Sequence, residues 1–232
     1  MNKIVVFGFK DSLVGQVVNF IKNTTNYEIQ YFITPNDFPQ IELEYEHARR
    51  PNKKTEFIEN NQIFGKKIFS EKNYIAQLKM DGINKVLVLE ENTILRSEIF
   101  RALKAANIKI ITYIHPTVFM AGDNSIGEGA IIFPQCYIGY KSDIGDGTII
   151  QSNCTIDHHN VIGKFADINQ NLTTGGFTYI GDFTEINISV DIINHIRIEN
   201  YSRIGAGSLV IKNCESNSLY FGRPAKFQKK IN

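Results

Sequence analysis

The chain has 232 residues and a mass of 26.4 kDa, with 25 lysines and arginines against 24 aspartates and glutamates. Because these charges nearly cancel, the chain lacks the basic field of a nucleic-acid-binding protein, and no apolar run reaches the roughly 18 residues needed to span a bilayer. The 3 cysteines cannot all pair and lack the CxxC spacing of a metal clip, which favours a reduced, cytoplasmic protein.

The first part of the chain, residues 1–113, alternates short apolar runs with segments of helical spacing. The run KIVVFGF predicts a buried strand, and the apolar residues after it recur as on one face of a helix. This alternation predicts an α/β domain with a short parallel sheet of mononucleotide-binding type. Residues 35–71 are irregular and are interpreted as an exposed insertion. The expected elements are strands over residues 3–9, 27–33, 83–89 and 108–113 and helices over residues 12–22 and 94–106.

A six-residue repeat fills the second part of the chain, residues 114–232, up to a C-terminal tail. Every sixth residue from Ile126 to Val210 is a β-branched aliphatic residue, apart from Thr174. The residue four places after each of them is mostly small, and all 3 cysteines occupy such positions. A period of six excludes a helical stripe and predicts a parallel β-solenoid in which the thiols are buried and free.

The dipeptide Ile-Gly recurs through this repeat, which resembles the hexapeptide-repeat acyltransferases, whose fold is a left-handed parallel β-helix. In that family three hexapeptides close one triangular coil, so that residues 18 apart stack with a spacing of about 4.8 Å. Together with the α/β first part, the whole chain resembles the NeuD/PglD-type sugar acyltransferases of bacterial surface-glycan synthesis. The Ile-Gly pairs begin at residues 126, 138, 144, 162, 180 and 204.

This resemblance implies the transfer of an acetyl group from acetyl-CoA, without a metal, to the amine of a nucleotide-linked amino sugar. The expected acceptor is a UDP- or dTDP-linked 4-amino-4,6-dideoxy sugar. The resemblance also implies a homotrimer whose active sites lie between adjacent solenoids. Two alternatives remain open: an O-acetyltransferase of the sialic-acid type, and a non-catalytic trimeric scaffold that binds a sugar nucleotide.

The segment Asp157-His158-His159 is the candidate catalytic site. Acyl transfer to an amine or a hydroxyl needs a general base, and a neutral histidine suits that task near pH 7. Residues 156–163 are similar to the family's catalytic segment, in which the base follows an acidic residue, so the resemblance makes His158 the base. The family usually has Glu or Asp at the position of His159. The group that orients the base is therefore left open between Asp157 and an acid of a neighbouring coil.

The acyl-CoA site is expected around Gly176, because residues 18 apart would place this glycine next to His158. A glycine there leaves room for an extended ligand and exposes a backbone N–H. The resemblance implies that backbone amides at Gly205 and Ala206 meet the pantetheine arm. It also implies that CoA phosphates meet basic side chains near the C-terminus, at Lys212, Arg223 and Lys226.

A nucleotide-sugar site is expected after the first strand, at Gly8. The chain lacks GxGxxG, so no dinucleotide fingerprint is present. Gly8 nevertheless admits a phosphate near the start of the following helix, with Lys10 or Ser12 as a partner. After the second strand, Asn36 and Asp37 are candidates for hydrogen bonds to a uracil-like base.

Overall fold

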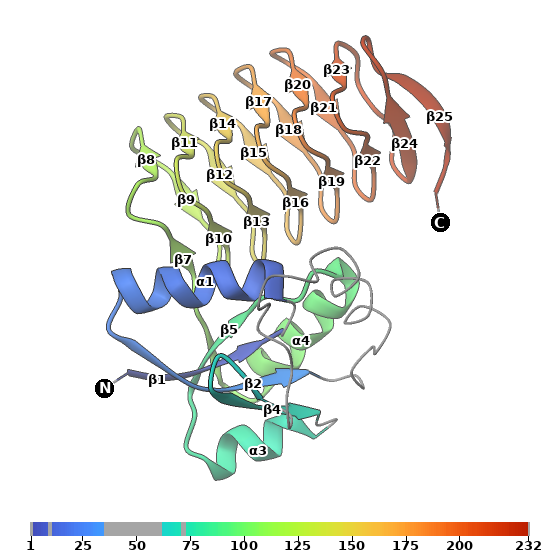
Figure 1. The fold of residues 1–232 in the computed structure, drawn as a ribbon. Helices are drawn as coiled ribbons and strands as arrows, with labels where there is room; N and C mark the ends of the chain where they lie inside the picture. The colour runs from blue at the N-terminus through green and yellow to red at the C-terminus, as the bar shows by residue number, and fades with distance from the viewer. Residues whose placement is uncertain (1, 9–10, 35–61, 71–72, 232) are drawn as a thin grey trace, which may run out of the picture. The chain divides into compact units, whose positions relative to one another are not determined.

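A computed structural model describes residues 2–8, 11–34, 62–70 and 73–231 of the chain (Figure 1). Its contacts divide into two compact units, one formed by Met1–Glu91 with Ile99–Ile110 and the other by Asn92–Glu98 with Ile111–Asn232. Within the described residues, no helix combines the length and the apolar character that a membrane span requires.

The α/β part is built around one sheet. Its described elements are β1 (Asn2–Phe7), α1 (Asp11–Thr24), β2 (Tyr27–Thr34), β3 (Gln62–Ile63), β4 (Lys66–Ser70), α3 (Tyr74–Met80), β5 (Lys85–Val88), α4 (Thr93–Ala105) and β6 (Lys109–Ile110). The strands follow the order β3-β4-β2-β1-β5-β6, and all neighbours are parallel except β3 and β4. Residues 4–7 of the central strand β1 are fully buried. The predicted α/β part with a short parallel sheet is confirmed.

The hairpin β3–β4 differs from the sequence-based expectation, which assigned residues 62–70 to an irregular insertion. Its turn residues Phe64 and Gly65 have φ of 50° and 68°, the left-handed pair that a two-residue hairpin turn requires. Ile63 and Ile68 are buried, and β4 pairs with β2 through Phe32 and Ile68. The segment is too short for a periodic signal, so only its burial identifies it. Residues 35–61 of the expected insertion lie outside the described residues.

The second unit is a solenoid of short strands in three sheets, and all neighbouring strands are parallel except β24 and β25 at its C-terminal end (Figure 1). Sheet 1 contains β7 (Tyr113–Ile114), β10 (Ile131–Ile132), β13 (Ile149–Ile150), β16 (Asp167–Ile168), β19 (Glu185–Ile186), β22 (Arg203–Ile204), β24 (Ser218–Phe221) and β25 (Lys226–Lys230). Sheet 2 contains β8 (Phe119–Met120), β11 (Tyr137–Ile138), β14 (Thr155–Ile156), β17 (Thr173–Thr174), β20 (Asp191–Ile192) and β23 (Leu209–Val210). Sheet 3 contains β9 (Ser125–Ile126), β12 (Asp143–Ile144), β15 (Val161–Ile162), β18 (Tyr179–Ile180) and β21 (Arg197–Ile198).

The register confirms the predicted coil of 18 residues. Ile138 pairs with Ile156 in sheet 2, and Ile144 pairs with Ile162 in sheet 3, each in parallel. The repeating isoleucine of each strand points inward, and most of this row is buried in one apolar cluster. Each fully buried isoleucine contributes about 1.5–3 kcal/mol relative to an exposed one, so the row is the main source of the solenoid's stability.

The small residues of the repeat fill the remaining interior. Cys136, Cys154 and Cys214 are buried and free, as the repeat predicts. Burial raises the pKa of Cys214 to about 12. The pKa of Cys154 is also raised, first by the hydrogen bond with Cys136 and then by burial. Cys154 and Cys214 therefore stay protonated, and all three buried side chains pack as small apolar groups.

The turns between sheets carry residues in the left-handed conformation. On the edge between sheets 2 and 3 these are Asp123, Lys141, His159, Phe177 and His195, with φ between 54° and 60°. Because the coil repeats after 18 residues, side chains at such positions lie over one another. Aromatic rings therefore stack along the solenoid, and a second stack runs through Phe165, Phe183 and Tyr201 on the edge between sheets 3 and 1.

Candidate active site

His158 lies on the edge of the solenoid between sheets 2 and 3, in the turn from β14 to β15. Gly176 occupies the same place one coil later, and the imidazole rests on it. A Cβ added to Gly176 would lie 2.5 Å from Cε1 and 2.7 Å from Nε2 of His158. The ring therefore fills the space that the absent side chain leaves, where the sequence led us to expect room for a ligand.

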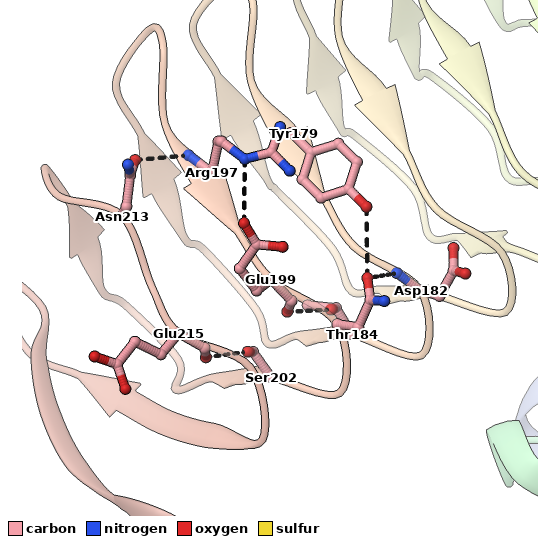
Figure 2. A network of polar contacts seen from close by, with 9 residues as sticks. Tyr179, Asp182, Thr184, Arg197, Glu199, Ser202, Asn213 and Glu215 are labelled. Atoms are coloured by element: carbon pink, nitrogen blue, oxygen red, sulfur yellow. Dashed lines mark hydrogen bonds and ion pairs between the residues drawn. The ribbon is translucent and has the colours of Figure 1, made fainter.

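The backbone N–H of Gly176 is a hydrogen-bond donor next to this ring. On the edge between sheets 3 and 1, equivalent N–H groups are capped from the next coil. Lys164 N–H donates to Asp182 Oδ1 at 2.7 Å. Asp182 N–H donates to Asn200 Oδ1 at 2.9 Å, and this bond is drawn at Asp182 in Figure 2. In the described part of the chain, no acceptor takes the Gly176 N–H. Gly176 can thus donate to a ligand beside His158.

The two neighbours of His158 play different parts. Oδ1 of Asp157 accepts a hydrogen bond from the backbone N–H of His158 at 2.7 Å, so this carboxylate fixes the turn and not the ring. The ring nitrogen Nδ1 of His158 lies 3.0 Å from Nδ1 of His159. Among the described residues, His159 is the hydrogen-bond partner of the imidazole, and Nε2 of His158 has none. The hydrogen-bond partner of this ring is therefore a second histidine.

Two polar residues in the interior support this turn. Thr174 is the exception in the aliphatic row, and Asn160 is a large amide in the row of small residues; both are buried. Asn160 Nδ2 donates to Thr174 Oγ1 at 2.6 Å, and Asn160 Oδ1 accepts from the backbone N–H of Thr178 at 2.5 Å. The same hydroxyl accepts the Asp157 N–H at 3.1 Å. Sequence reasoning gave neither residue a role, although both departures from the repeat mark this place.

A stack of rings holds His159 from the side. Its ring is nearly parallel to that of Phe177, with a centroid distance of 4.7 Å, and Phe177 in turn stacks on His195 at 5.2 Å. The ring of Tyr140 is nearly perpendicular to that of His159, at 83°, with a centroid distance of 5.9 Å. The ring of His158 stands perpendicular to that of His159, at 87°. The orientation of the pair is thus fixed by packing.

The glycine–alanine pair expected to meet the pantetheine arm lies elsewhere in the chain. Gly205 N–H donates to Tyr220 O at 2.8 Å, and a Cβ on this glycine would lie 2.7 Å from Cβ of Phe221. Gly205 therefore allows the close approach of β24, and its N–H is not free for a ligand. The exposed Ala206 follows on the edge between sheets 1 and 2. One chain alone does not bring Ala206 to His158, because they lie on two different edges of sheet 2.

The basic residues expected to meet CoA phosphates are exposed on the solenoid. Lys212 lies in the column of His158, three coils away, which corresponds to about 14 Å. Arg223 pairs with Asp191 of sheet 2 at 3.0 Å and donates to the backbone of the same region. Lys226 is the first residue of the exposed β25. Sheet 2 therefore lies between the turn of His158 and a cationic C-terminal segment.

Gly8 ends the central strand of the α/β sheet. Its φ is 105°, and a Cβ would lie 2.9 Å from the carbonyl oxygen of Leu89, so this turn needs glycine. The strand order reverses between β1 and β5, and ligands of open parallel sheets bind outside the carboxyl ends of the strands at such a point. Gly8 is therefore in a suitable place for a nucleotide. Lys10, Asn36 and Asp37 lie outside the described residues, as does the side chain of Ser12.

A metal-binding arrangement is not found in the part of the chain that the structure describes, where no three His, Cys, Asp or Glu side chains cluster.

Comparison with known proteins supports the repeat and the fold. Residues 125–158 match the bacterial transferase hexapeptide (six repeats) family model. This match covers part of the solenoid, from β9 to the turn after β14. Comparison with curated protein sequences finds no match.

Solved structures match nearly the whole of this chain. PerB from Caulobacter crescentus, in complex with CoA and GDP-perosamine, is 17% identical with a TM-score of 0.82, covering 99% of this chain and 98% of that chain. The acetyltransferase domain of PglB from Neisseria gonorrhoeae, in complex with acetyl coenzyme A, is 18% identical with a TM-score of 0.78, covering 98% and 99%. The α/β part followed by a left-handed β-helix is thereby confirmed.

Proposed function

We propose that this protein transfers an acetyl group from acetyl-CoA to the amine of a nucleotide-linked amino sugar. The observation that carries the proposal is the imidazole of His158 resting on Gly176, with the free N–H of that glycine beside it. A base and a backbone donor at one point are what acyl transfer needs. Two similar structures of the same fold hold CoA with GDP-perosamine and acetyl coenzyme A, respectively, which supports both substrate classes.

The chemistry follows from these two groups. The sugar amine attacks the thioester carbonyl, and Nε2 of His158 takes the proton that the nitrogen loses. The N–H of Gly176 donates to the oxygen that gains negative charge in the tetrahedral intermediate. The carbon–sulfur bond then breaks, and the thiol of CoA leaves with the proton that the imidazolium returns. No acyl-enzyme is required, because the amine attacks the thioester directly and neither neighbour of His158 in the chain is a serine or a cysteine.

Substrate binding involves both units in this proposal. Ala206, Lys212, Arg223 and Lys226 contact the CoA, and Gly8 admits a phosphate of the sugar nucleotide. Because Ala206 and His158 lie on different edges of one solenoid, a homotrimer would let one chain supply the base and the Gly176 amide while its neighbour supplies the Ala206 amide that contacts the CoA. The expected nucleotide is UDP or dTDP, with a 4-amino-4,6-dideoxy sugar. Free buried thiols fit a reducing compartment such as the cytoplasm.

The test follows CoA thiol release with acetyl-CoA and a panel of UDP-, dTDP- and GDP-linked amino sugars. We expect one acceptor to drive release and His158→Ala to lower kcat by about 100-fold or more. The matched control is Lys164→Ala, which changes the equivalent position of the neighbouring edge and should retain wild-type turnover. Release with a sialic acid, and with no amino sugar, would instead indicate O-acetylation. Binding of a sugar nucleotide without release would indicate the scaffold.

A further inference from the structure

The ring that orients the proposed base is itself an imidazole. Two Nδ1 atoms at 3.0 Å form a hydrogen bond only if one of them carries a hydrogen and the other offers its lone pair. The pair of His158 and His159 therefore shares one proton at this contact. Where the hydrogen resides decides whether Nε2 of His158 carries a lone pair or a proton.

We propose that His159 is a positioning residue that accepts the Nδ1 hydrogen of His158 and so keeps the lone pair on Nε2 of His158. This inference rests on the proposed function, because it concerns the base of that reaction. The arrangement persists through the reaction. When His158 takes the substrate proton, both of its nitrogens carry hydrogen, and Nδ1 still donates to His159 without any rearrangement.

The surroundings of His159 suit a fixed acceptor. Its ring stacks on Phe177 and makes a perpendicular contact with Tyr140, and its φ is 55° in the left-handed turn. The ring therefore presents Nδ1 to His158 in one direction. Replacing the histidine by another flat side chain would keep the packing and remove the acceptor, so the two roles can be separated.

The acceptor is neutral, and this affects the response to pH. The titratable and charged groups around the pair are Asp157, the ring of Tyr140, His195 behind Phe177, and Lys141, whose Nζ lies 5.2 Å from the centre of the Tyr140 ring. The Asp157 carboxylate is bonded to backbone and not to either ring. A carboxylate in place of His159 would favour the charged form of His158 more than a neutral ring does.

Three substitutions test the proposal, and each residue already occurs at a left-handed turn of this chain. Phe177, Asn153 and Asp123 have φ of 58°, 62° and 54°. His159→Phe keeps the ring stack but has no acceptor, so we expect kcat to fall at least about tenfold with an unchanged KM for acetyl-CoA. His159→Asn places Oδ1 where Nδ1 was, and should keep kcat within about threefold. His159→Asp should move the acid limb of the kcat/KM profile to higher pH by about one unit or more.

A purely structural role for the ring predicts the reverse order, with His159→Phe active and the two smaller variants impaired. That result would overturn the proposal. A second readout needs no acceptor sugar: ¹⁵N NMR of the imidazoles at pH 8 should show hydrogen on Nδ1 of His158 and a bare Nδ1 on His159. The opposite assignment would overturn this inference even in an active enzyme. Absence of CoA release by the wild type with every acceptor would overturn the proposed function instead.

Discussion

Gly176→Ala tests the geometry on which the proposed mechanism depends. The added Cβ would meet the His158 ring at 2.5 Å, whereas ordinary contacts of a Cβ begin at 3.4 Å. The ring must therefore retreat by about 1 Å, and a displacement of that size can lower catalysis by about 100-fold. The fold should tolerate the change, because the φ of Gly176 is not in the left-handed range.

The stability of the Gly176→Ala variant should change little, in contrast to its kcat. Replacing a glycine by alanine at a compatible φ and ψ stabilises a protein by about 0.4–1 kcal/mol through the unfolded chain. The half-buried imidazole loses some contact when it moves, which offsets part of this gain. We therefore expect Tm to stay within about 3 °C of the wild-type value while kcat falls.

The assay compares CoA release by wild type, Gly176→Ala, His158→Ala and the double variant. If the alanine acts by displacing the His158 ring, it should lower kcat no further when that ring is absent, so the kcat of the double variant should equal that of His158→Ala. A Gly176→Ala enzyme with wild-type kcat would refute the reasoning. Equal losses in both backgrounds would show that the methyl group blocks the acyl donor and not the base.

Three further variants or reagents probe the support of the site and the two units. Thr174→Val removes the hydroxyl that Asn160 Nδ2 contacts; it should cost about 1–3 kcal/mol in urea unfolding and lower kcat, and an unchanged midpoint would contradict the polar network. Tyr31→Phe removes the 2.6 Å hydrogen bond to Oδ2 of Asp81, whose pKa the bond lowers. A carboxyl pKa that is lowered by folding stabilises the fold above about pH 3.9, and this stabilisation is lost as the pH falls and the carboxylate is protonated. The Tyr31→Phe variant should therefore unfold more easily than wild type at pH 7, and as easily as wild type at pH 2. Because burial raises the pKa of Cys214 to about 12, Cys214 of the native protein at pH 8 should react with iodoacetamide at least about 100-fold more slowly than Cys214 of the unfolded protein, and rapid labelling of native Cys214 would contradict this burial.

The solenoid could be predicted from sequence because the residue that recurs every six positions is the one that is buried in each strand. An inward position such as Ile156 has the same environment as Ile138 one coil earlier, so one residue type satisfies every coil. The same register places His158 on Gly176, which made this contact predictable without coordinates. The central strand of the α/β sheet was also predictable from sequence. Its residues 4–7 are buried on both faces, and they form an uninterrupted apolar run.

Side-chain direction at the turn was not predictable in this way. Asp157 and His159 flank the same residue, and either could have contacted the ring of His158 on sequence grounds. The left-handed φ of His159 and the stack with Phe177 bring its ring to the imidazole, while Asp157 turns to the backbone N–H. Such choices depend on local backbone geometry and on packing between coils, neither of which leaves a periodic signal.

The exceptions in a repeat are more informative than its regular members. An apolar residue at position 174 and a small one at 160 would have preserved the pattern and avoided burying two polar groups, each of which costs free energy unless it is bonded. The chain instead pairs Thr174 with Asn160 and uses them to hold two backbone N–H groups, one at Asp157. Both departures lie beneath the one turn that carries the proposed base. In a solenoid whose coils are otherwise interchangeable, a bonded polar pair in the interior therefore marks the coil in which the geometry of the turn has to be fixed.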